Sequence, residues 1–185
     1  MALRIIGGNA KGRALSSPGG ARTRPTSNVV RSAIFSMLEP YLGGARVLDL
    51  FSGTGALGVE ALSRGAGWVD FLERDARQCA AIKGTLRLLD YANQGRVHRN
   101  QAERAPELLE GPYNVILMDP PYSYKKLEAL LERIGESCLT DDGSVIAVEH
   151  SRHQDLPMEV DGLRCIKQRR YGETMVTLYH WGEAA

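Results

Sequence analysis

The segment Asp119-Pro120-Pro121-Tyr122 has residue types that suit chemistry on an amino group. It follows the apolar run Tyr113–Met118, so it is expected at the end of a buried strand. The two prolines remove two N–H donors and hold the chain extended, which leaves the Asp119 carboxylate and the Pro120 carbonyl as acceptors. These acceptors suit an exocyclic base amine, with Tyr122 as a stacking surface. The predicted catalytic residues are therefore Asp119, Pro120, Pro121 and Tyr122.

A second stretch, Val47–Leu62, predicts a strand, a tight loop and a helix. Gly53 and Gly55 permit a close ligand approach, at the point where the next helix presents its free N–H groups. With Gly58 they satisfy G-x-G-x-x-G, and Glu73 follows at about the distance of a ribose-binding acid, so a dinucleotide site is one interpretation. Asp49 favours a cationic aminoacyl group over an anionic pyrophosphate. That preference indicates S-adenosylmethionine.

Strand-like and helix-like segments alternate along the chain and predict an α/β fold with a mainly parallel sheet covered on both faces. Strands are expected at Val47–Leu50, Trp68–Leu72, Arg96–Arg99, Tyr113–Met118, Ser144–Glu149, Leu163–Gln168 and Thr174–Tyr179, the last two as an antiparallel hairpin. Helices are expected at Ala56–Arg64, Ala76–Leu89, Ala102–Leu109 and Leu127–Ile134. In a doubly wound sheet of this kind the carboxyl ends of the strands form one ligand crevice.

The segment before this sheet predicts a small extension. Leu3–Ile6 and Arg13–Leu15 are short apolar pieces that suit a hairpin or an irregular ribbon. A helix is expected from Thr26 or Ser27, as N-cap, to the neighbourhood of Pro40, with an apolar stripe that includes Val29. We therefore divide the chain into an N-terminal substrate and cofactor extension, 1–40, and a catalytic domain, 41–185.

Length and composition fit one core. The chain has 185 residues, 43% of them hydrophobic, which is too few for two full domains. No apolar run predicts a membrane span or a signal peptide, so a cytoplasmic location is expected. The three cysteines are widely spaced and predict neither a disulfide framework nor a zinc site.

Charge is unevenly distributed although the net charge is only +1. No acidic residue precedes Glu39, and a second basic cluster spans Arg164–Arg170. Such asymmetry favours phosphate binding over a merely solvated face. The candidate contacts to a nucleic acid are Arg13, Arg22, Arg24, Arg31, Lys167, Arg169 and Arg170.

Val47–Leu62 together with Asp119–Tyr122 resembles a class I S-adenosylmethionine-dependent methyltransferase that modifies exocyclic amines. The resemblance extends to the bacterial 16S ribosomal RNA guanine-N2 methyltransferase family, RsmD. The segments that carry this closer resemblance are Arg4-Ile5-Ile6-Gly7-Gly8, Arg24-Pro25-Thr26 with Arg31 and Phe35, Leu62-Ser63-Arg64-Gly65-Ala66 and Arg170-Tyr171-Gly172-Glu173-Thr174. It covers nearly the whole chain and implies a Rossmann-like fold with a seven-stranded sheet and a small N-terminal hairpin and helix.

The resemblance implies methyl transfer from S-adenosylmethionine to the N2 amine of a guanine in 16S ribosomal RNA, either as naked RNA or within an assembling small subunit, without a metal or a membrane. It places Thr26 near the methionine carboxylate. Asn100-Gln101-Ala102 stands where many class I enzymes have an Asp that reads the adenine, and either amide suits that role. The implied cofactor site comprises Thr26, Asp49, Phe51, Gly53, Gly55, Glu73, Asn100, Gln101, Ala102 and Asp119.

Three other functions remain open from the residues alone. Asp119–Tyr122 recognises an amine and not its ring, so an amino-methyltransferase acting on adenine or cytosine in DNA is the nearest alternative. A nicotinamide-dependent oxidoreductase would use Gly53–Gly58 and Glu73 but leaves Asp119–Tyr122 without a role. The basic segments by themselves would also suit a non-catalytic RNA-binding protein.

Overall fold

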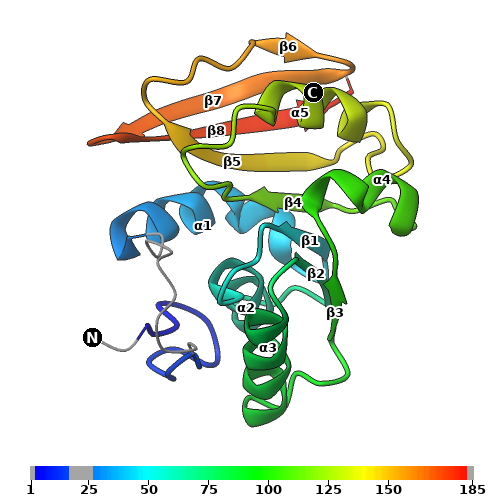
Figure 1. Cartoon of the computed structure of the whole chain (residues 1–185). Coiled ribbons are helices and arrows are strands. Elements are labelled where there is room, and N and C mark those ends of the chain that lie inside the picture. Colours follow the sequence, from blue (N-terminus) through cyan, green and yellow to red (C-terminus); the bar gives the residue numbers. More distant parts are fainter. Residues whose placement is uncertain (1–2, 17–26, 183–185) are drawn as a thin grey trace.

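The computed structural model describes residues 3–16 and 27–182, and its centre is one mixed sheet (Figure 1). Eight strands follow one another in the order β3-β2-β1-β4-β5-β8-β7-β6. They are β1 (Arg46–Leu50), β2 (Trp68–Glu73), β3 (Gly95–Arg99), β4 (Val115–Met118), β5 (Val145–Ser151), β6 (Glu159–Val160), β7 (Leu163–Tyr171) and β8 (Thr174–Trp181). The pairs from β3 to β5 are parallel, and those from β5 to β6 are antiparallel. The predicted α/β class and the antiparallel C-terminal hairpin are confirmed.

The sheet has one strand more than the predicted seven. The additional strand, β6, is two residues long and pairs only with β7, through Glu159↔Arg164 and Val160↔Leu163. A segment of two residues is too short to show the alternation that identifies a strand in a sequence. The predicted strands differ from the observed ones only at their ends.

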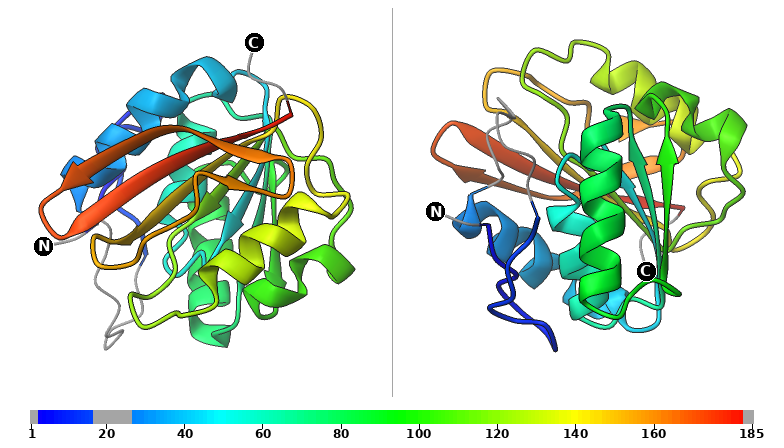
Figure 2. Two further views of the ribbon diagram at one scale, coloured as in Figure 1. Left: turned by 90° about the horizontal axis from the view of Figure 1, so that it is seen from above. Right: turned by 60° about the horizontal axis from the view of Figure 1, so that its bottom comes forward.

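Helices cover both faces of the sheet (Figure 2). They are α1 (Asn28–Leu42), α2 (Ala56–Ser63), α3 (Ala76–Leu88), the short 3-10 helix η1 (Ala102–Arg104), α4 (Ala105–Leu108) and α5 (Leu127–Gly135). Side chains of α1, α2 and α3 pack in one core with Val47, Leu117 and Ala147, and we call this side the α1 face. Side chains of α4 and α5 pack in a second core with Ile116 and Val148, on the α5 face. None of the described helices is long and apolar enough to cross a membrane.

Helix α1 differs in two ways from its prediction. Ser27 is the N-cap, and its side chain accepts a hydrogen bond from the Val30 N–H, but the helix continues through Pro40 to Leu42. Proline is tolerated there because only one backbone bond of the last turns is lost. The expected apolar stripe is wrong at Val29, which is 67% exposed, whereas Arg31 is fully buried.

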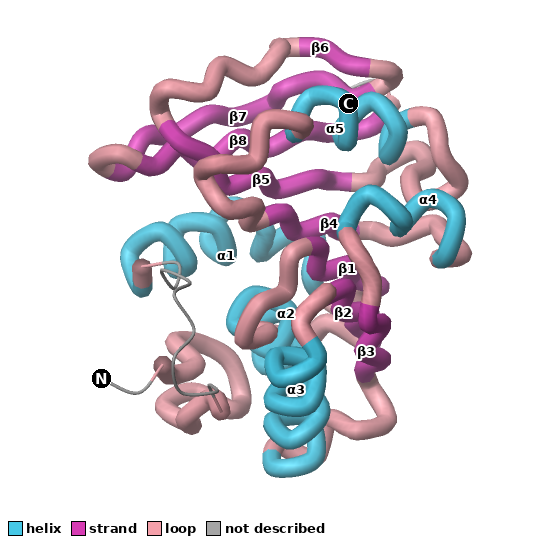
Figure 3. The backbone as a smooth tube through the Cα atoms, viewed as in Figure 1, coloured by secondary structure: helices cyan, strands magenta, loops and turns pink. Residues whose placement is uncertain are grey.

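The N-terminal segment from Leu3 to Ser16 is an irregular ribbon and not a regular hairpin, because Arg4↔Ala14 is an isolated bridge (Figure 3). The ribbon is attached to α2. The Ile6 N–H donates to Glu60 Oε2 at 2.9 Å, and the Asn9 N–H donates to the Ser63 carbonyl at 2.8 Å. These two hydrogen bonds, one to a side chain and one to the backbone, join the ribbon to the helix that follows the glycine loop.

Candidate active site at the carboxyl edge of the sheet

Five parallel strands end at one edge of the sheet, and the predicted site residues follow those ends. Asp49 is the last but one residue of β1, Glu73 is the last residue of β2, and Asp119 follows β4 directly. Asn100 follows β3, and its N–H donates to the Glu73 carbonyl at 3.0 Å. The geometry therefore brings the predicted residues of all four strand ends to the same edge.

The three glycines after β1 have different local surroundings. Gly55 is the N-cap of α2 in the left-handed region, and a Cβ there would lie 2.9 Å from Ile82. At Gly58 a Cβ would lie 2.3 Å from the Phe71 ring, so this glycine permits close packing of the helix on the sheet. Gly53 also has a positive φ, and the nearest atom to a Cβ there is 3.9 Å away. Gly53 is therefore the glycine that borders open space.

Glu73 holds this glycine loop in place. Its Oε2 accepts a hydrogen bond from the Gly53 N–H at 2.8 Å, and its Oε1 accepts one from the Asp75 N–H at 2.7 Å. The side chain is half-buried at the end of β2. Each carboxylate oxygen can accept more than one hydrogen bond, so both retain capacity for a ligand hydroxyl.

Asp49 is a buried acid beneath the loop. It is 1% exposed, and its Oδ2 accepts a hydrogen bond from the Gly58 N–H at 2.9 Å. Burial raises the pKa of Asp49 to about 8, because the Gly58 hydrogen bond only partly offsets it and the neighbouring Asp119 and Glu73 raise it further. Burial thus favours the protonated form of Asp49 in this structure. In the described ranges, no group of three or more His, Cys, Asp and Glu side chains is arranged to hold a metal ion.

The Asp119–Tyr122 segment leaves β4 at this edge. Asp119 is half-buried, Pro120 is buried, and Pro121 is exposed. Tyr122 is 43% exposed, and its hydroxyl lies 2.5 Å from Oγ1 of Thr174, the first residue of β8. The segment therefore presents a carboxylate and an aromatic ring three positions apart in the chain. The ring is hydrogen-bonded to the antiparallel half of the sheet through Thr174.

Glu149 is a site candidate that the sequence analysis missed. Leu117 of β4 pairs with Ala147 of β5, and both lie in the core of the α1 face. Because side chains alternate along a strand, Glu149, two residues after Ala147 in β5, lies on that same face, and Asp119 directly follows the neighbouring end of β4. Glu149 is 5% exposed. An acid that ends the apolar run Val145–Val148 was the available signal, since it repeats the pattern of Asp119 after Met118.

Two aromatic rings close the other side of the loop. Phe51 has a φ of 60°, and its ring packs edge-on against Tyr124 with centroids 5.0 Å apart. The Tyr124 hydroxyl donates to Glu103 Oε1 at 2.8 Å, which links the segment after β4 to η1. The predicted adenine-reading residues differ in exposure: Asn100 is half-buried, Gln101 exposed and Ala102 buried. Tyr124 was not predicted, because its contacts come from three separate loops.

Basic side chains of β7 lie on the α1 face, in the antiparallel half of the sheet. A register shift lies between Cys165 and Lys167. Before it, Cys165 pairs with Tyr179 of the second core, and after it Lys167 pairs with Leu178 of the first. The extra residue therefore moves the odd-numbered side chains from the α5 face to the α1 face.

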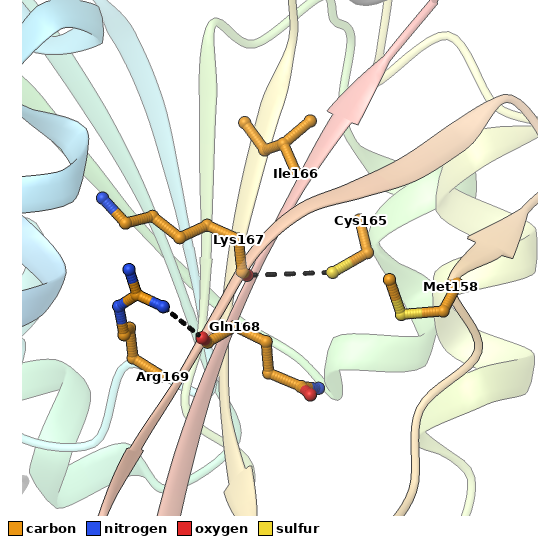
Figure 4. A pocket seen from close by; sticks show the side chains of 6 residues that line it. All are labelled: Met158, Cys165, Ile166, Lys167, Gln168 and Arg169. Atoms are coloured by element: carbon orange, nitrogen blue, oxygen red, sulfur yellow. Dashed lines mark hydrogen bonds between the residues drawn. The ribbon is translucent and has the colours of Figure 1, made fainter.

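Figure 4 shows Lys167 and Arg169 pointing to one side of β7, away from Met158 and Cys165. These four residues, with Ile166 and Gln168, line a surface hollow of about 500 Å³. Arg169 pairs with Val176 of β8, and Val176 pairs with Glu149 of β5. Arg169, Val176 and Glu149 thus form one row across the sheet, which points toward Asp119.

The other predicted RNA contacts have different outcomes. Arg13 is exposed, and its guanidinium donates to the Leu88 carbonyl at 3.2 Å. Arg170 is exposed and donates to the Gly172 carbonyl at 2.9 Å. An RNA contact from Arg31 is wrong for this structure, since Arg31 is fully buried and donates to the Arg4 carbonyl and to Asn28. Arg22, Arg24 and Thr26 lie outside the described residues.

Comparison with known proteins agrees with this arrangement. The sequence pattern of the family described as Conserved hypothetical protein 95 matches residues 3–180. The chain is 41% identical to the YlbH protein of Bacillus subtilis (strain 168), over 96% of this chain and 98% of that one. It is 32% identical to "Ribosomal RNA small subunit methyltransferase D" of Escherichia coli (strain K12), over 96% of this chain and 89% of that one.

Solved structures show the same fold. The yhhF protein of Escherichia coli superposes with a TM-score of 0.88 at 30% identity, and the match covers 98% of this chain and 99% of that one. An RNA methyltransferase from Salinibacter ruber in complex with S-adenosyl-L-homocysteine shares the fold at 13% identity, with a TM-score of 0.67 and coverage of 88% and 96%. The chain therefore belongs to the Conserved hypothetical protein 95 family, the family of the ribosomal RNA small subunit methyltransferases D.

Proposed function

We propose that the protein transfers a methyl group from S-adenosylmethionine to the exocyclic N2 amine of a guanine in 16S ribosomal RNA. One observation carries the proposal: the amine-recognising segment Asp119–Tyr122 lies at the same sheet edge as the glycine loop and Glu73. The relatives named as ribosomal RNA small subunit methyltransferases support the RNA substrate. The choice of guanine rests on the family resemblance.

The residues at the edge fit a cationic cofactor. Open space at Gly53 admits a ligand against the backbone, and the half-buried Glu73 is placed to accept hydrogen bonds from ribose hydroxyls. Asp49 adds a carboxyl group that, once ionised, suits an ammonium or a sulfonium and opposes a pyrophosphate. We therefore assign the cofactor to Asp49, Phe51, Gly53, Gly55, Glu73 and the Asn100–Ala102 segment.

The chain's own residues then act on the guanine. When bound, S-adenosylmethionine would supply an electrophilic methyl group: an N–C bond to the amine would form as the S–C bond breaks, with S-adenosylhomocysteine as the leaving group and one proton lost from the nitrogen. Asp119 and the Pro120 carbonyl orient the amine by accepting its N–H hydrogens, which favours the more nucleophilic, pyramidal nitrogen. Asp119 or water takes the proton. Tyr122 holds the base by stacking, a contact worth about 1–3 kcal/mol.

The raised pKa of Asp49 predicts a pH dependence of cofactor binding. In the free protein the carboxyl group, with a pKa of about 8, is mainly protonated at neutral pH. A bound cation favours the ionised form, so binding releases a proton and affinity rises with pH until the pH passes the raised pKa, above which this contribution is constant. We expect up to about tenfold per pH unit below that pKa.

Calorimetric titration with S-adenosylmethionine across this pH range measures the effect. The Asp49→Asn variant is the control, because it retains an oxygen for the Gly58 N–H and cannot ionise. The parent should show the steeper rise. Identical pH profiles for the two proteins would contradict the assignment of Asp49 to the cation.

We further propose that RNA lies along the α1 face, over β7 and the N-terminal extension. Residues 1–40 would then bind substrate and cofactor beside the methyltransferase domain 41–185. Lys167 and Arg169 are exposed on that face, and in the described part of the chain neither has an ion pair with a carboxylate. Both are therefore available to phosphates.

Replacing Lys167 and Arg169 by alanine should weaken RNA binding and reduce its salt dependence. Each lost phosphate contact lowers the slope of log affinity against log salt by about 0.7–0.9, so the double variant should lose about 1.4–1.8. Arg164→Ala is the matched control on the same strand, because Arg164 already pairs with Glu159 at 2.9 Å. Binding curves at several salt concentrations measure the slopes. Equal slopes for the parent and the double variant would show that the RNA does not contact Lys167 and Arg169.

A transfer assay tests the proposed function directly. Radiolabelled methyl groups should pass from S-adenosylmethionine to 16S ribosomal RNA but not to 23S ribosomal RNA or to duplex DNA. Naked RNA and assembled small subunits should be compared, since either is a possible substrate form. Transfer to DNA would favour the adenine or cytosine alternative, and binding of a nicotinamide dinucleotide without binding of S-adenosylmethionine would favour an oxidoreductase.

A further inference from the structure

The hydroxyl contact of Tyr122 joins two distant parts of the chain. Tyr122 is 43% exposed as a residue, so packing alone restrains its side chain little. Its hydroxyl lies 2.5 Å from Oγ1 of Thr174, which is 52 residues away in sequence and only 5% exposed. The ring is therefore oriented relative to the sheet, by a buried partner, and not only by its own loop.

Thr174 is itself held firmly. It pairs with Ser151 of β5 on one side and with Tyr171 of β7 on the other. The turn before it is fixed to the end of β5, because the Arg152 N–H donates to the Glu173 carbonyl at 3.0 Å and Arg152 Nε lies 2.9 Å from Glu173 Oε2. As a β-branched residue, threonine also has few side-chain rotamers.

The position of Thr174 on the sheet relates it to the proposed RNA path. Thr174 and Val176 are two residues apart in β8, so their side chains lie on the same face, and Val176 packs in the core of the α1 face. Arg169 pairs with Val176, so Thr174 and the basic side chains of β7 belong to the same face of one hairpin. The Tyr122–Thr174 contact thus connects that hairpin to the Asp119–Tyr122 segment.

We propose that Thr174 is a positioning residue for methyl transfer: it holds the Tyr122 ring at the angle at which the ring stacks on the target base. The role rests on the proposed function. Thr174 need not touch the substrate. It acts through the Tyr122 hydroxyl, so that the ring is oriented before the base arrives. The conformational entropy of the ring is then already lost when the reaction step begins.

Thr174→Val tests this role because valine keeps the shape of threonine and lacks the hydroxyl. We expect turnover with 16S ribosomal RNA to fall about three- to tenfold, the range for loss of one hydrogen bond, with unchanged affinity for S-adenosylmethionine. Thr174→Ser should restore most of the turnover. Thr177→Val is the matched control: Thr177 lies on the same strand but bonds to His150 and Gln168, and its loss should leave turnover unchanged.

A double-mutant cycle separates positioning from a general structural effect. Tyr122→Phe keeps the ring and removes the hydroxyl, so it should reduce turnover to the same extent as Thr174→Val. The double variant should be no slower than the slower single variant, because both remove one contact. Losses that multiply, or a Thr174→Val enzyme as fast as the parent, would overturn the role.

Base stacking gives a readout that is independent of turnover. When an RNA carries 2-aminopurine at the methylated position, the fluorescence of that base should be quenched on binding to the parent protein. At equal occupancy the Thr174→Val protein should quench this fluorescence less. Equal quenching would refute the positioning role while the proposed function stands. A parent protein that transfers no methyl group to 16S ribosomal RNA would instead overturn the proposed function, and with it this role.

Discussion

Replacing Asp119 by alanine is expected to abolish methylation while leaving the affinity for S-adenosylmethionine within a few-fold of the parent. Asp119 is the half-buried acid that follows β4, and it is assigned to the reacting amine. Loss of one preorganised hydrogen-bonding group at a reacting atom costs about 10²–10³ in rate. Single-turnover methyl transfer and calorimetric titration of the cofactor measure the two quantities separately.

Asp119→Asn provides the matched control. The amide retains one acceptor oxygen but cannot take a proton, so its loss of rate should be smaller than that of the alanine variant. Circular dichroism and thermal unfolding of both variants show whether the fold is retained. Near-parental turnover in a folded Asp119→Ala protein would refute the amine-acceptor role.

Replacing Glu73 by alanine should have the largest effect on cofactor affinity. The change removes an acceptor for the ribose and also the bond from the Gly53 N–H at 2.8 Å, which holds the glycine loop. Hydrogen bonds to charged groups contribute about 1.5–3 kcal/mol, so the affinity should fall by about tenfold to 150-fold.

Two further variants make the Glu73 result specific. Glu73→Gln keeps one oxygen and should lose less affinity than Glu73→Ala. Glu132 is an exposed acid on α5, and the Glu132→Ala variant should bind S-adenosylmethionine with the affinity of the parent. Titration calorimetry with S-adenosylmethionine and S-adenosylhomocysteine gives the values, and an unchanged affinity for Glu73→Ala would place the ribose at another residue.

Local patterns in the sequence were sufficient to predict most of the fold, and they identified the candidate residues that follow the strand ends. The glycine loop, Glu73 and Asp119–Tyr122 are each recognisable within a few residues, because backbone angles, lost donors and strand ends depend on near neighbours. The order of parallel strands then brings them to one edge. The same reasoning located the antiparallel hairpin from the turn at Tyr171–Glu173.

Features that depend on contacts between distant segments could not be predicted in this way. The burial of Arg31 depends on how the N-terminal ribbon lies against α1, with the Arg4 carbonyl as its partner. The placement of Lys167 and Arg169 on the α1 face depends on a register shift that follows from pairing with β8. Glu149 ends an apolar run in the sequence, but only the β4–β5 register relates its position to the end of β4.

Nucleoside mass spectrometry of 16S ribosomal RNA shows which nucleoside the protein methylates. RNA from cells lacking the protein should be incubated with the purified protein and S-adenosylmethionine, digested and analysed, with the Asp119→Ala protein as control. N2-methylguanosine should appear at a single position with the parent protein and not with the Asp119→Ala protein. Formation of N6-methyladenosine or N4-methylcytidine in its place, or no methylated nucleoside at all, would contradict the proposed function.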